Sequence, residues 1–355
     1  MSLSVLLYRI SLPAPKLDTK DALNLLRDHY GMEGSAEPLG SRQDLNFRTN
    51  SSQGRFVLKI CRGDYATIEL QAQHAALAVL RQAGLLVPVV RGALDGSDLI
   101  SVECAGQVVQ IRLLEYLEGQ TLTNYPHLGA ELFAQMGETA ARVGRALAGF
   151  QHPGAIRTVQ WDPRHAGPLV EHLLPALPDA YRHAVANACA QASARLEPLR
   201  ASLPEQVVHL DITDDNTLWQ RNDEQRWQLN GVIDYGDLVR TWRIADLAIT
   251  CASLLHHCDG NALAMLPAVA AYHAYYPLQH AELQALWPLI VLRGCVLVSS
   301  SAHQLQLDPT NHYILENLAH EWQIFNVASK IPGTLIEAAI FEALSMTNAP
   351  RPIIS

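Results

Sequence analysis

The chain has 355 residues, of which 49% are apolar and 17% charged, a composition typical of globular proteins rather than disordered ones. This length is sufficient for two domains with cores of their own. The net charge is −9 and there is no run of Lys or Arg, so we expect no nucleic-acid partner, because that affinity rests on neutralising phosphates.

Cysteine usage and hydropathy indicate a cytoplasmic protein. The six cysteines, at positions 61, 104, 189, 251, 258 and 295, form no C-x-x-C pair, as expected for reduced thiols. The apolar start at 1–10 has no basic beginning and no convincing cleavage site. The longest apolar stretch, 286–298, contains Arg293 and is too short to span a bilayer, so we expect no membrane partner.

The first third of the chain predicts a small unit of mixed α and β structure. A helix starts at 18–21 and stops at Gly31, a second helix stops near Gly84, and turns at 95–96 and 105–106 predict a hairpin. Three β-like stretches lie at 34–39, 45–50 and 55–61, the second helix lies at 68–80, and a further β-like stretch lies at 108–117. The sequence therefore predicts an N-terminal lobe at 1–117 that ends in a short hinge strand.

From about residue 118 the chain is rich in Ala and Leu with helical spacing, apart from β-like stretches on either side of 209–216 and before 234. This pattern predicts a larger, mainly helical C-terminal lobe at 118–355. The expected fold class is α+β and bilobal, with a β-rich lobe, a larger helical lobe and a cleft between them.

Two segments of the N-terminal lobe are candidates for nucleotide binding. The segment 39–47 has turn formers, among them Ser41, between two β-like stretches and predicts a hairpin over the nucleotide. No G-x-x-x-x-G-K-[ST] loop is present in the sequence, which argues against that ATPase class. Lys59 lies near the end of an alternating strand and Glu69 lies in the following helix. A strand Lys paired with a helix Glu fixes an ammonium group over the α- and β-phosphates.

The most informative motif lies between 209 and 237. Asp211 and Asn216 belong to the pattern H-x-D-x-x-x-x-N, and Asp234 follows in a hydrophobic-hydrophobic-D-x-G segment. Phosphoryl transfer needs a carboxylate that receives the proton of the acceptor hydroxyl, and oxygen ligands for the magnesium ion on the triphosphate. We therefore predict that Asp211 receives the proton of the acceptor hydroxyl and that Asn216 and Asp234 bind Mg²⁺. His209 is expected to brace the loop by hydrogen bonding.

Two neighbouring features have competing interpretations. Asp214 and Asp215 are either turn formers or, beside the base, ligands for the ammonium group of an acceptor. The segment 251–258 holds two Cys and two His, but it has helical character and its cysteines are seven residues apart. That spacing lacks the short knuckle of zinc sites, so we expect buried helix cysteines with incidental histidines.

With these residues in view, the chain resembles the aminoglycoside phosphotransferase and choline kinase superfamily, relatives of the protein kinases. It is most similar to the hydroxylysine kinase branch. The resemblance rests on Asp44-Leu45-Asn46-Phe47 before the Lys strand, on the strand 112–119, on Trp161-Asp162, and on Glu316-Asn317 with Trp322. It extends from about residue 20 to residue 325.

The resemblance implies a protein-kinase-like fold, Mg²⁺ as cofactor, and ATP or GTP as co-substrate. It makes Asp211 the base, Asn216 and Asp234 the magnesium ligands, and Glu115, Tyr116 and Leu117 the purine-binding hinge. One departure is Leu210, where relatives usually have Gly or Asn. A bulky side chain leaves this backbone position less conformational freedom.

The acceptor is the least determined part of the prediction. Arg293 lies in an apolar helical segment and is either a structural partner of an Asp such as Asp246 or a ligand for an acceptor carboxylate. We expect a kinase that phosphorylates a hydroxyl of a small cationic or zwitterionic molecule, hydroxylysine first. The alternatives are an aminoglycoside, choline, homoserine or fructosamine kinase, and a catalytically silent nucleotide-binding pseudokinase. The oligomeric state stays open.

Overall fold

The computed structural model describes residues 3–12, 14–41 and 44–347. The elements of the N-terminal part are α1 (Leu3–Ile10), α2 (Thr19–Tyr30), β1 (Gly34–Leu39), β2 (Leu45–Ser51), β3 (Gly54–Arg62), α3 (Thr67–Gln82), β4 (Val90–Arg91), β5 (Ile100–Cys104) and β6 (Gln107–Glu115). The elements that follow are α4 (Ala130–Leu147), η1 (Pro153–Ala155), η2 (Pro163–His165), α5 (Ala166–Leu173), η3 (Leu174–Ala176), α6 (Asp179–Leu196), η4 (Glu197–Ser202), β7 (Glu205–Val208), β8 (Thr217–Arg221), β9 (Trp227–Val232), η5 (Tyr235–Asp237) and β10 (Val239–Trp242). The chain then continues through α7 (Ala245–Leu254), η6 (Leu255–His257), η7 (Ala262–Met265), α8 (Leu266–Tyr275), α9 (His280–Leu307), α10 (His312–Lys330) and α11 (Gly333–Thr347).

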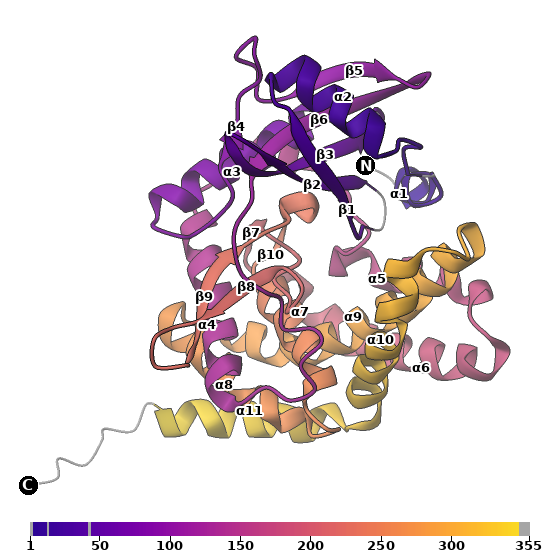
Figure 1. Ribbon diagram of the computed structural model, residues 1–355. Helices are drawn as coiled ribbons and strands as arrows, with labels where there is room; N and C mark the ends of the chain where they lie inside the picture. Colours follow the sequence, from indigo (N-terminus) through magenta and orange to yellow (C-terminus); the bar gives the residue numbers. More distant parts are fainter. Residues whose placement is uncertain (1–2, 13, 42–43, 348–355) are drawn as a thin grey trace, which may run out of the picture.

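The N-terminal part is built on one antiparallel sheet in the order β1-β2-β3-β6-β4, with β5 also paired to β6 (Figure 1). Helix α2 covers one face of this sheet. It begins at Asp18, whose side chain forms a capping box with Asp21, and ends at Gly31 with φ of 63°. Leu58 and Ile60 of β3 pack in the cluster under α2. Because side chains alternate along a strand, Lys59 points to the opposite face.

Helix α3 contacts the C-terminal part as well as the sheet. Gly154 of η1 lies so close to the start of α3 that a Cβ at this position would overlap the main-chain oxygen of Ile68. A glycine is therefore required at this contact. The buried residues Ala76, Leu77 and Leu80 of α3 belong to the same hydrophobic cluster as Met136 of α4.

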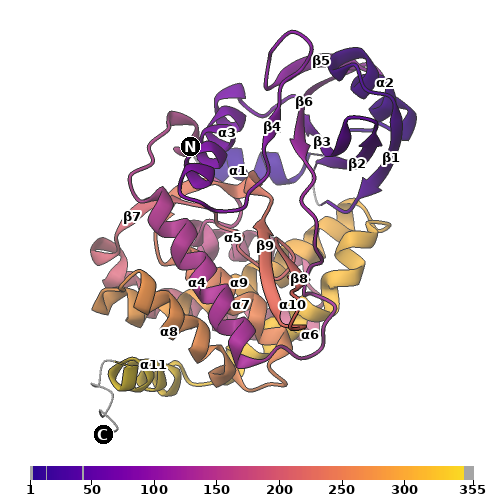
Figure 2. The same ribbon diagram turned by 60° about the vertical axis from the view of Figure 1, so that its left-hand side comes forward.

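The C-terminal part is helical and is organised around α9, which packs against α5, α6, α7, α10 and α11 (Figures 1 and 2). Helix α9 has the length and hydropathy of a membrane span, and α10 with α11 would be a second candidate if the bent pair counted as one. However, 89% of the apolar window of α9 is buried inside the protein, which is the environment of a core helix.

Two short β ladders carry the two loops of the 209–237 motif into the space between the sheet and the helices. β7 pairs with β10 and β8 pairs with β9, both antiparallel. The loop 209–216 connects β7 to β8, and Asp234 directly follows β9. The main-chain amide of Ile233 donates to the oxygen of Asn216 at 2.9 Å, so the two halves of the motif are joined by backbone.

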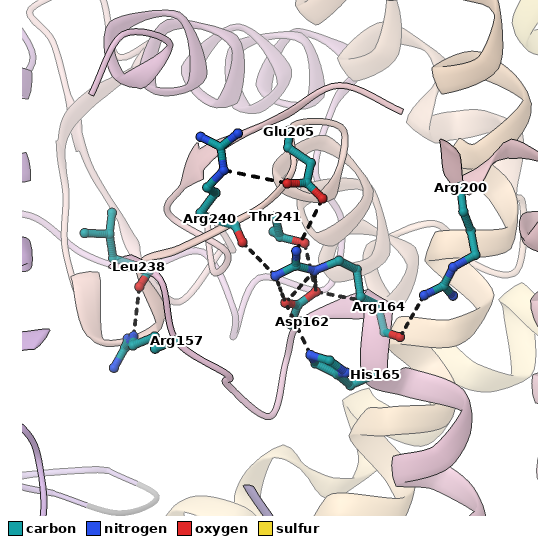
Figure 3. Close-up of polar contacts among 9 residues, drawn as sticks. All are labelled: Arg157, Asp162, Arg164, His165, Arg200, Glu205, Leu238, Arg240 and Thr241. Carbon is teal, nitrogen blue, oxygen red and sulfur yellow. Dashed lines mark hydrogen bonds and ion pairs between the residues drawn. The ribbon is translucent and has the colours of Figure 1, made fainter. Parts of the chain in front are cut away.

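The segment 161–165 is fixed by a buried carboxylate, Asp162, which is 0% exposed (Figure 3). Asp162 accepts a hydrogen bond from the hydroxyl of Thr241 at 2.8 Å and pairs with the guanidinium of Arg164 at 2.6 Å. Arg164 also donates to the main-chain oxygen of Arg240 at 2.7 Å. These contacts tie the segment to β10, and they thereby hold the adjacent Trp161 in place.

The architecture confirms the predicted fold class, because an antiparallel sheet precedes a mostly helical part. The predicted elements at 34–39, 45–50, 55–61 and 68–80 correspond to β1, β2, β3 and α3 within a few residues. The division between lobes at residues 117 and 118 stays a prediction.

A half-buried histidine of α3, His74, makes the stability of the fold depend on pH. Burial, with the charge of Arg112, lowers the pKa of His74 from 6.5 to about 3. The unfolded chain takes up a proton below pH 6.5 while the folded protein stays neutral at His74, so stability is lost as the pH falls from 6.5 towards 3.

We expect this group to reduce the free energy of unfolding by about 2 kcal/mol between pH 7 and pH 5. His74→Gln should show a correspondingly smaller loss, measured by urea unfolding at both pH values. The exposed His172 offers the control substitution His172→Gln. Identical pH dependence in the His74 variant and in the native protein would contradict the assignment.

Candidate active site

A cleft of about 340 Å³ lies between the sheet and the helical part. Most of the residues singled out in the sequence line it, namely Ser41, Lys59, Asp211, Asp214, Asp215, Asn216, Asp234 and Arg293. The lining also includes Arg9 and Trp161, which come from regions distant in the sequence. Glu69 and the hinge residues Glu115, Tyr116 and Leu117 are outside the lining of this cleft.

Asp211 is held on both sides in the cleft. Asn216 donates through Nδ2 to the Oδ2 of Asp211 at 2.6 Å and to its main-chain oxygen at 3.0 Å. Arg293 donates through Nη2 to the Oδ1 of Asp211 at 2.8 Å. The carboxylate therefore has a fixed direction, which is what a group that accepts a proton from a bound hydroxyl requires.

His209 braces the catalytic loop, as predicted. It is 0% exposed, and its Nε2 lies 3.0 Å from the main-chain oxygen of Ile233. Because that oxygen only accepts, Nε2 carries the hydrogen, and Nδ1 accepts the amide hydrogen of Asp211 at 3.2 Å. The ring thus links Asp211 to Ile233, the residue that precedes Asp234.

Leu210 occupies a left-handed backbone conformation with φ of 68°, which disfavours a branched side chain. The carboxylate of Asp246 compensates: it accepts the amide of Leu210 at 2.7 Å and the amide of His209 at 3.3 Å. The leucine side chain is fully buried and packs in a cluster with Val208 and Ile249. The bulky residue at this position is therefore part of the core.

We predict that Leu210→Gly destabilises the protein. Removing the left-handed strain regains about 1–2 kcal/mol, whereas emptying a buried leucine site costs about 3–5 kcal/mol. The net expected loss in the free energy of unfolding is about 2 kcal/mol, measured by chemical denaturation. Leu210→Ala empties the same site without relieving the left-handed strain, so we expect it to be less stable than Leu210→Gly. A glycine variant that is less stable than the alanine variant would contradict this prediction.

Lys59 and Asp234 form the ion pair that joins the sheet to the helical part. The Nζ of Lys59 lies 2.8 Å from the Oδ1 of Asp234, which also accepts the amide of Gly236. Desolvation in the cleft raises the pKa of Asp234, whose side chain is still 43% exposed, but the charge and hydrogen bond of Lys59 outweigh it and lower the value to about 2. Asp234 is therefore ionised, as a ligand for a divalent cation must be.

The predicted pair between Lys59 and Glu69 is wrong. Glu69 is 4% exposed and receives the Nη1 and Nη2 of Arg9 at 3.1 Å each. The Nη1 of Arg157 approaches the same carboxylate at 3.4 Å. Two guanidinium groups thus satisfy Glu69, and Lys59 binds Asp234 instead. Arg9 and Arg157 had no motif around them, so sequence reasoning missed both.

The hinge residues make main-chain hydrogen bonds within the N-terminal part. The amide of Glu115 donates to the oxygen of Val89 at 2.8 Å, and the amide of Tyr116 donates to the oxygen of Arg55 at 3.1 Å. Their predicted contact with a purine, like that of Leu117, stays a prediction.

Arg293 does not pair with Asp246, the partner suggested as a structural alternative. Its guanidinium stacks on the ring of Trp161 at 4.4 Å and binds Asp211 through Nη2. Its second terminal nitrogen, Nη1, is buried and has no hydrogen-bond partner within the described part of the chain. A donor directed in this way is suited to an anionic group of a ligand.

Asp214 and Asp215, predicted to be either turn formers or ligands for an acceptor ammonium group, have different surroundings. Asp214 is 4% exposed, and burial raises the pKa of its carboxyl, but the contacts with His256 and His257 outweigh burial and lower this pKa well below the usual range. Asp215 contacts the hydroxyls of Thr123 and Tyr313, and burial together with the charge of Asp214 raises its pKa to about 6. Of the two, Asp215 is placed to meet an ammonium group.

The cysteines near these histidines are buried in the helical core, as expected. Cys251 is 0% exposed, and the thiol of Cys258 donates to the main-chain oxygen of Leu254 at 3.2 Å. Burial raises the pKa of Cys258 to about 12, so its thiol stays protonated.

Comparison with known proteins places the site in context. The model of the phosphotransferase enzyme family matches residues 35–286 of the chain. Hydroxylysine kinase of Danio rerio is 25% identical over 316 residues, which cover 85% of this chain and 88% of that protein. Homoserine kinase of Pseudomonas aeruginosa is 29% identical over 281 residues, which cover 77% of this chain and 80% of that protein.

Solved structures share the fold at lower identity. A microcompartment-associated aminopropanol kinase has a TM-score of 0.69 at 17% identity and covers 92% of this chain and 100% of its own. Amicoumacin kinase hAmiN, solved in complex with AMP-PNP, Ca²⁺ and Ami, has a TM-score of 0.67 at 15% identity, covering 90% of this chain and 97% of its own.

Proposed function

Since the chain belongs to the phosphotransferase enzyme family and is a small-molecule kinase, we propose that it transfers the γ-phosphate of a nucleotide to the hydroxyl of an amino acid. Hydroxylysine is the first candidate and homoserine the second, because kinases of both are relatives over most of the chain. The observation that carries the amino-acid assignment is the unpartnered, buried Nη1 of Arg293 in the cleft, within the described residues.

Asp211 is the residue that accepts the proton of the attacking hydroxyl. Its carboxylate is oriented by Asn216 and Arg293, so little reorganisation is needed when an acceptor binds. Lys59 supplies the positive charge for the phosphates, on release from Asp234.

Asn216 and Asp234 would hold Mg²⁺, since amide and carboxylate oxygens are the ligands that this ion prefers. The amide of Asn216 donates through Nδ2 to Asp211, so its oxygen is the group left to face a cation. When bound, the ion neutralises the charge of the phosphate oxygens. Asp234, ionised by its contact with Lys59, fits this role.

The acceptor is bound through its charged groups. A carboxylate fits Nη1 of Arg293, which stacks on Trp161 and is thereby fixed in plane. The ammonium group fits Asp215, which lines the same cleft beside Tyr313. ATP and GTP are both retained as phosphate donors, because main-chain groups usually read the purine at a hinge and the residue types there do not decide between the two. A cytoplasmic location, where both are available, remains part of the proposal.

The first test is release of nucleoside diphosphate with Mg²⁺ and either ATP or GTP. The acceptor panel contains hydroxylysine, homoserine, 1-amino-2-propanol, choline and an aminoglycoside. We expect turnover with an amino acid, and a fall of about 10²–10⁴-fold in kcat for Asp211→Asn, the range that proton transfer contributes. Magnesium-dependent nucleotide binding should persist in this variant. Preference for the aminoglycoside or choline would overturn the amino-acid assignment.

The second test concerns the carboxylate. Arg293→Met should lower kcat/KM for homoserine and hydroxylysine by about 10–100-fold more than for 1-amino-2-propanol, which has no carboxylate, because a charged hydrogen bond is worth about 1.5–3 kcal/mol. Loss of the contact with Asp211 affects all acceptors alike, so the ratio between acceptors isolates the carboxylate. An unchanged ratio would show that Arg293 serves Asp211 alone. Nucleotide affinity is the control and should stay constant.

A further inference from the structure

Two adjacent histidines and an aspartate form a compact, buried cluster beside the cleft. His256 and His257 belong to η6, directly after α7, and Asp214 belongs to the loop between β7 and β8. The Nε2 of His256 lies 3.0 Å from the Oδ2 of Asp214, and the Nε2 of His257 lies 3.2 Å from the same oxygen. His256 is 8% exposed, His257 is 3% exposed and Asp214 is 4% exposed.

The hydrogen bond on the other side of His257 fixes its tautomer. Its Nδ1 lies 2.6 Å from the main-chain oxygen of Tyr125, and a carbonyl oxygen only accepts, so Nδ1 carries the hydrogen. A neutral His257 therefore directs the lone pair of Nε2 at the carboxylate of Asp214. Two electron-rich atoms at 3.2 Å repel one another unless a positive charge lies with them. That charge is either a second proton on the ring or a metal ion.

The spacing of the three atoms matches a metal site. The candidate ligand atoms of Asp214, His256 and His257 all lie within 4.8 Å of one another. Ligands of a tetrahedral ion with bonds of about 2.0–2.1 Å are separated by about 3.3 Å. In addition, histidines that bind metals usually donate their other ring hydrogen to a carbonyl or carboxylate, as His257 does to Tyr125.

The ligand types select the ion. Imidazole nitrogens suit zinc, copper and nickel, whereas magnesium takes oxygen ligands. We propose that Asp214, His256 and His257 bind a divalent first-row transition ion of the zinc class, separate from the Mg²⁺ of Asn216 and Asp234. Three protein ligands leave a fourth position. This fourth position faces the cleft, because Asp214, His256 and the neighbouring His320 are among the residues that line the cleft.

His320 supports a polar occupant at this point. Its ring stacks on that of His256 with 4.3 Å between centroids. Its Nδ1 is buried and has no hydrogen-bond partner among residues 3–12, 14–41 and 44–347. The site does not depend on kinase activity, so it can be tested independently of the proposed function.

The experiment is titration of chelator-treated protein with Co²⁺, followed by its visible absorption, and with Zn²⁺, followed by calorimetry, both in excess Mg²⁺. We expect one equivalent to bind, with the intense Co²⁺ bands of a four-coordinate site. His256→Gln and His257→Gln should each weaken binding by at least about 100-fold, since even loss of an outer hydrogen bond to a ligand costs about 10–100-fold. The exposed His172 provides the control His172→Gln, which should bind like the native protein.

A weak, octahedral Co²⁺ spectrum in the native protein would overturn the proposal and favour a protonated His257 paired with Asp214. Equal affinity in His172→Gln and His257→Gln would show an adventitious ion only. The spectrum of the native protein is decisive even if a variant fails to fold, and circular dichroism of the metal-free variants identifies that case.

Discussion

The carboxylate of Asp246 accepts the main-chain amides of both His209 and Leu210, and the shape of the catalytic loop depends on this contact. Asp246 is completely buried, and burial raises its pKa to about 7. A buried carboxyl of this kind is tolerated because it is hydrogen-bonded. The loop that it holds turns through a left-handed residue and delivers Asp211 to the cleft, where Asn216 and Arg293 fix its direction.

Within the cleft, two of the carboxylates are paired with cations. Lys59 neutralises Asp234, and Arg293 neutralises Asp211. Carboxylates gathered at this density would repel one another without such partners. In the proposed reaction these two cations would have different tasks. Lys59 would leave Asp234 for the phosphates while a divalent ion takes its place on Asp234, whereas Arg293 would keep Asp211 through Nη2 and meet the acceptor carboxylate through Nη1.

Local features of the fold could be predicted from the sequence, whereas the partners of buried charged side chains, which lie far away in the sequence, could not. The capping box at Asp18, the alternation around Lys59 and the loop between β7 and β8 are each encoded within a few neighbouring residues. Asp211 and Asn216 are also near neighbours in the sequence, whereas Asp234 is brought to them by the β8–β9 ladder and the hydrogen bond from Ile233 to Asn216. By contrast, the partners of Glu69 lie 60 and 88 residues away, and nothing in their own surroundings marks them. The pairing of Asp214 with His257, across 43 residues, was hidden in the same way.

The attachment of α3 has a consequence for motion of the lobes. Glu69 is bound by Arg157, which also donates to the main-chain oxygen of Leu238 (Figure 3), and Gly154 lies against the first turn of the helix. Helix α3 is therefore anchored to the helical part, although its sequence belongs with the sheet. Any opening of the cleft that preserves these contacts would leave α3 with the helical part and move the sheet with α2. The boundary between the two moving bodies would then run through the N-terminal third of the chain.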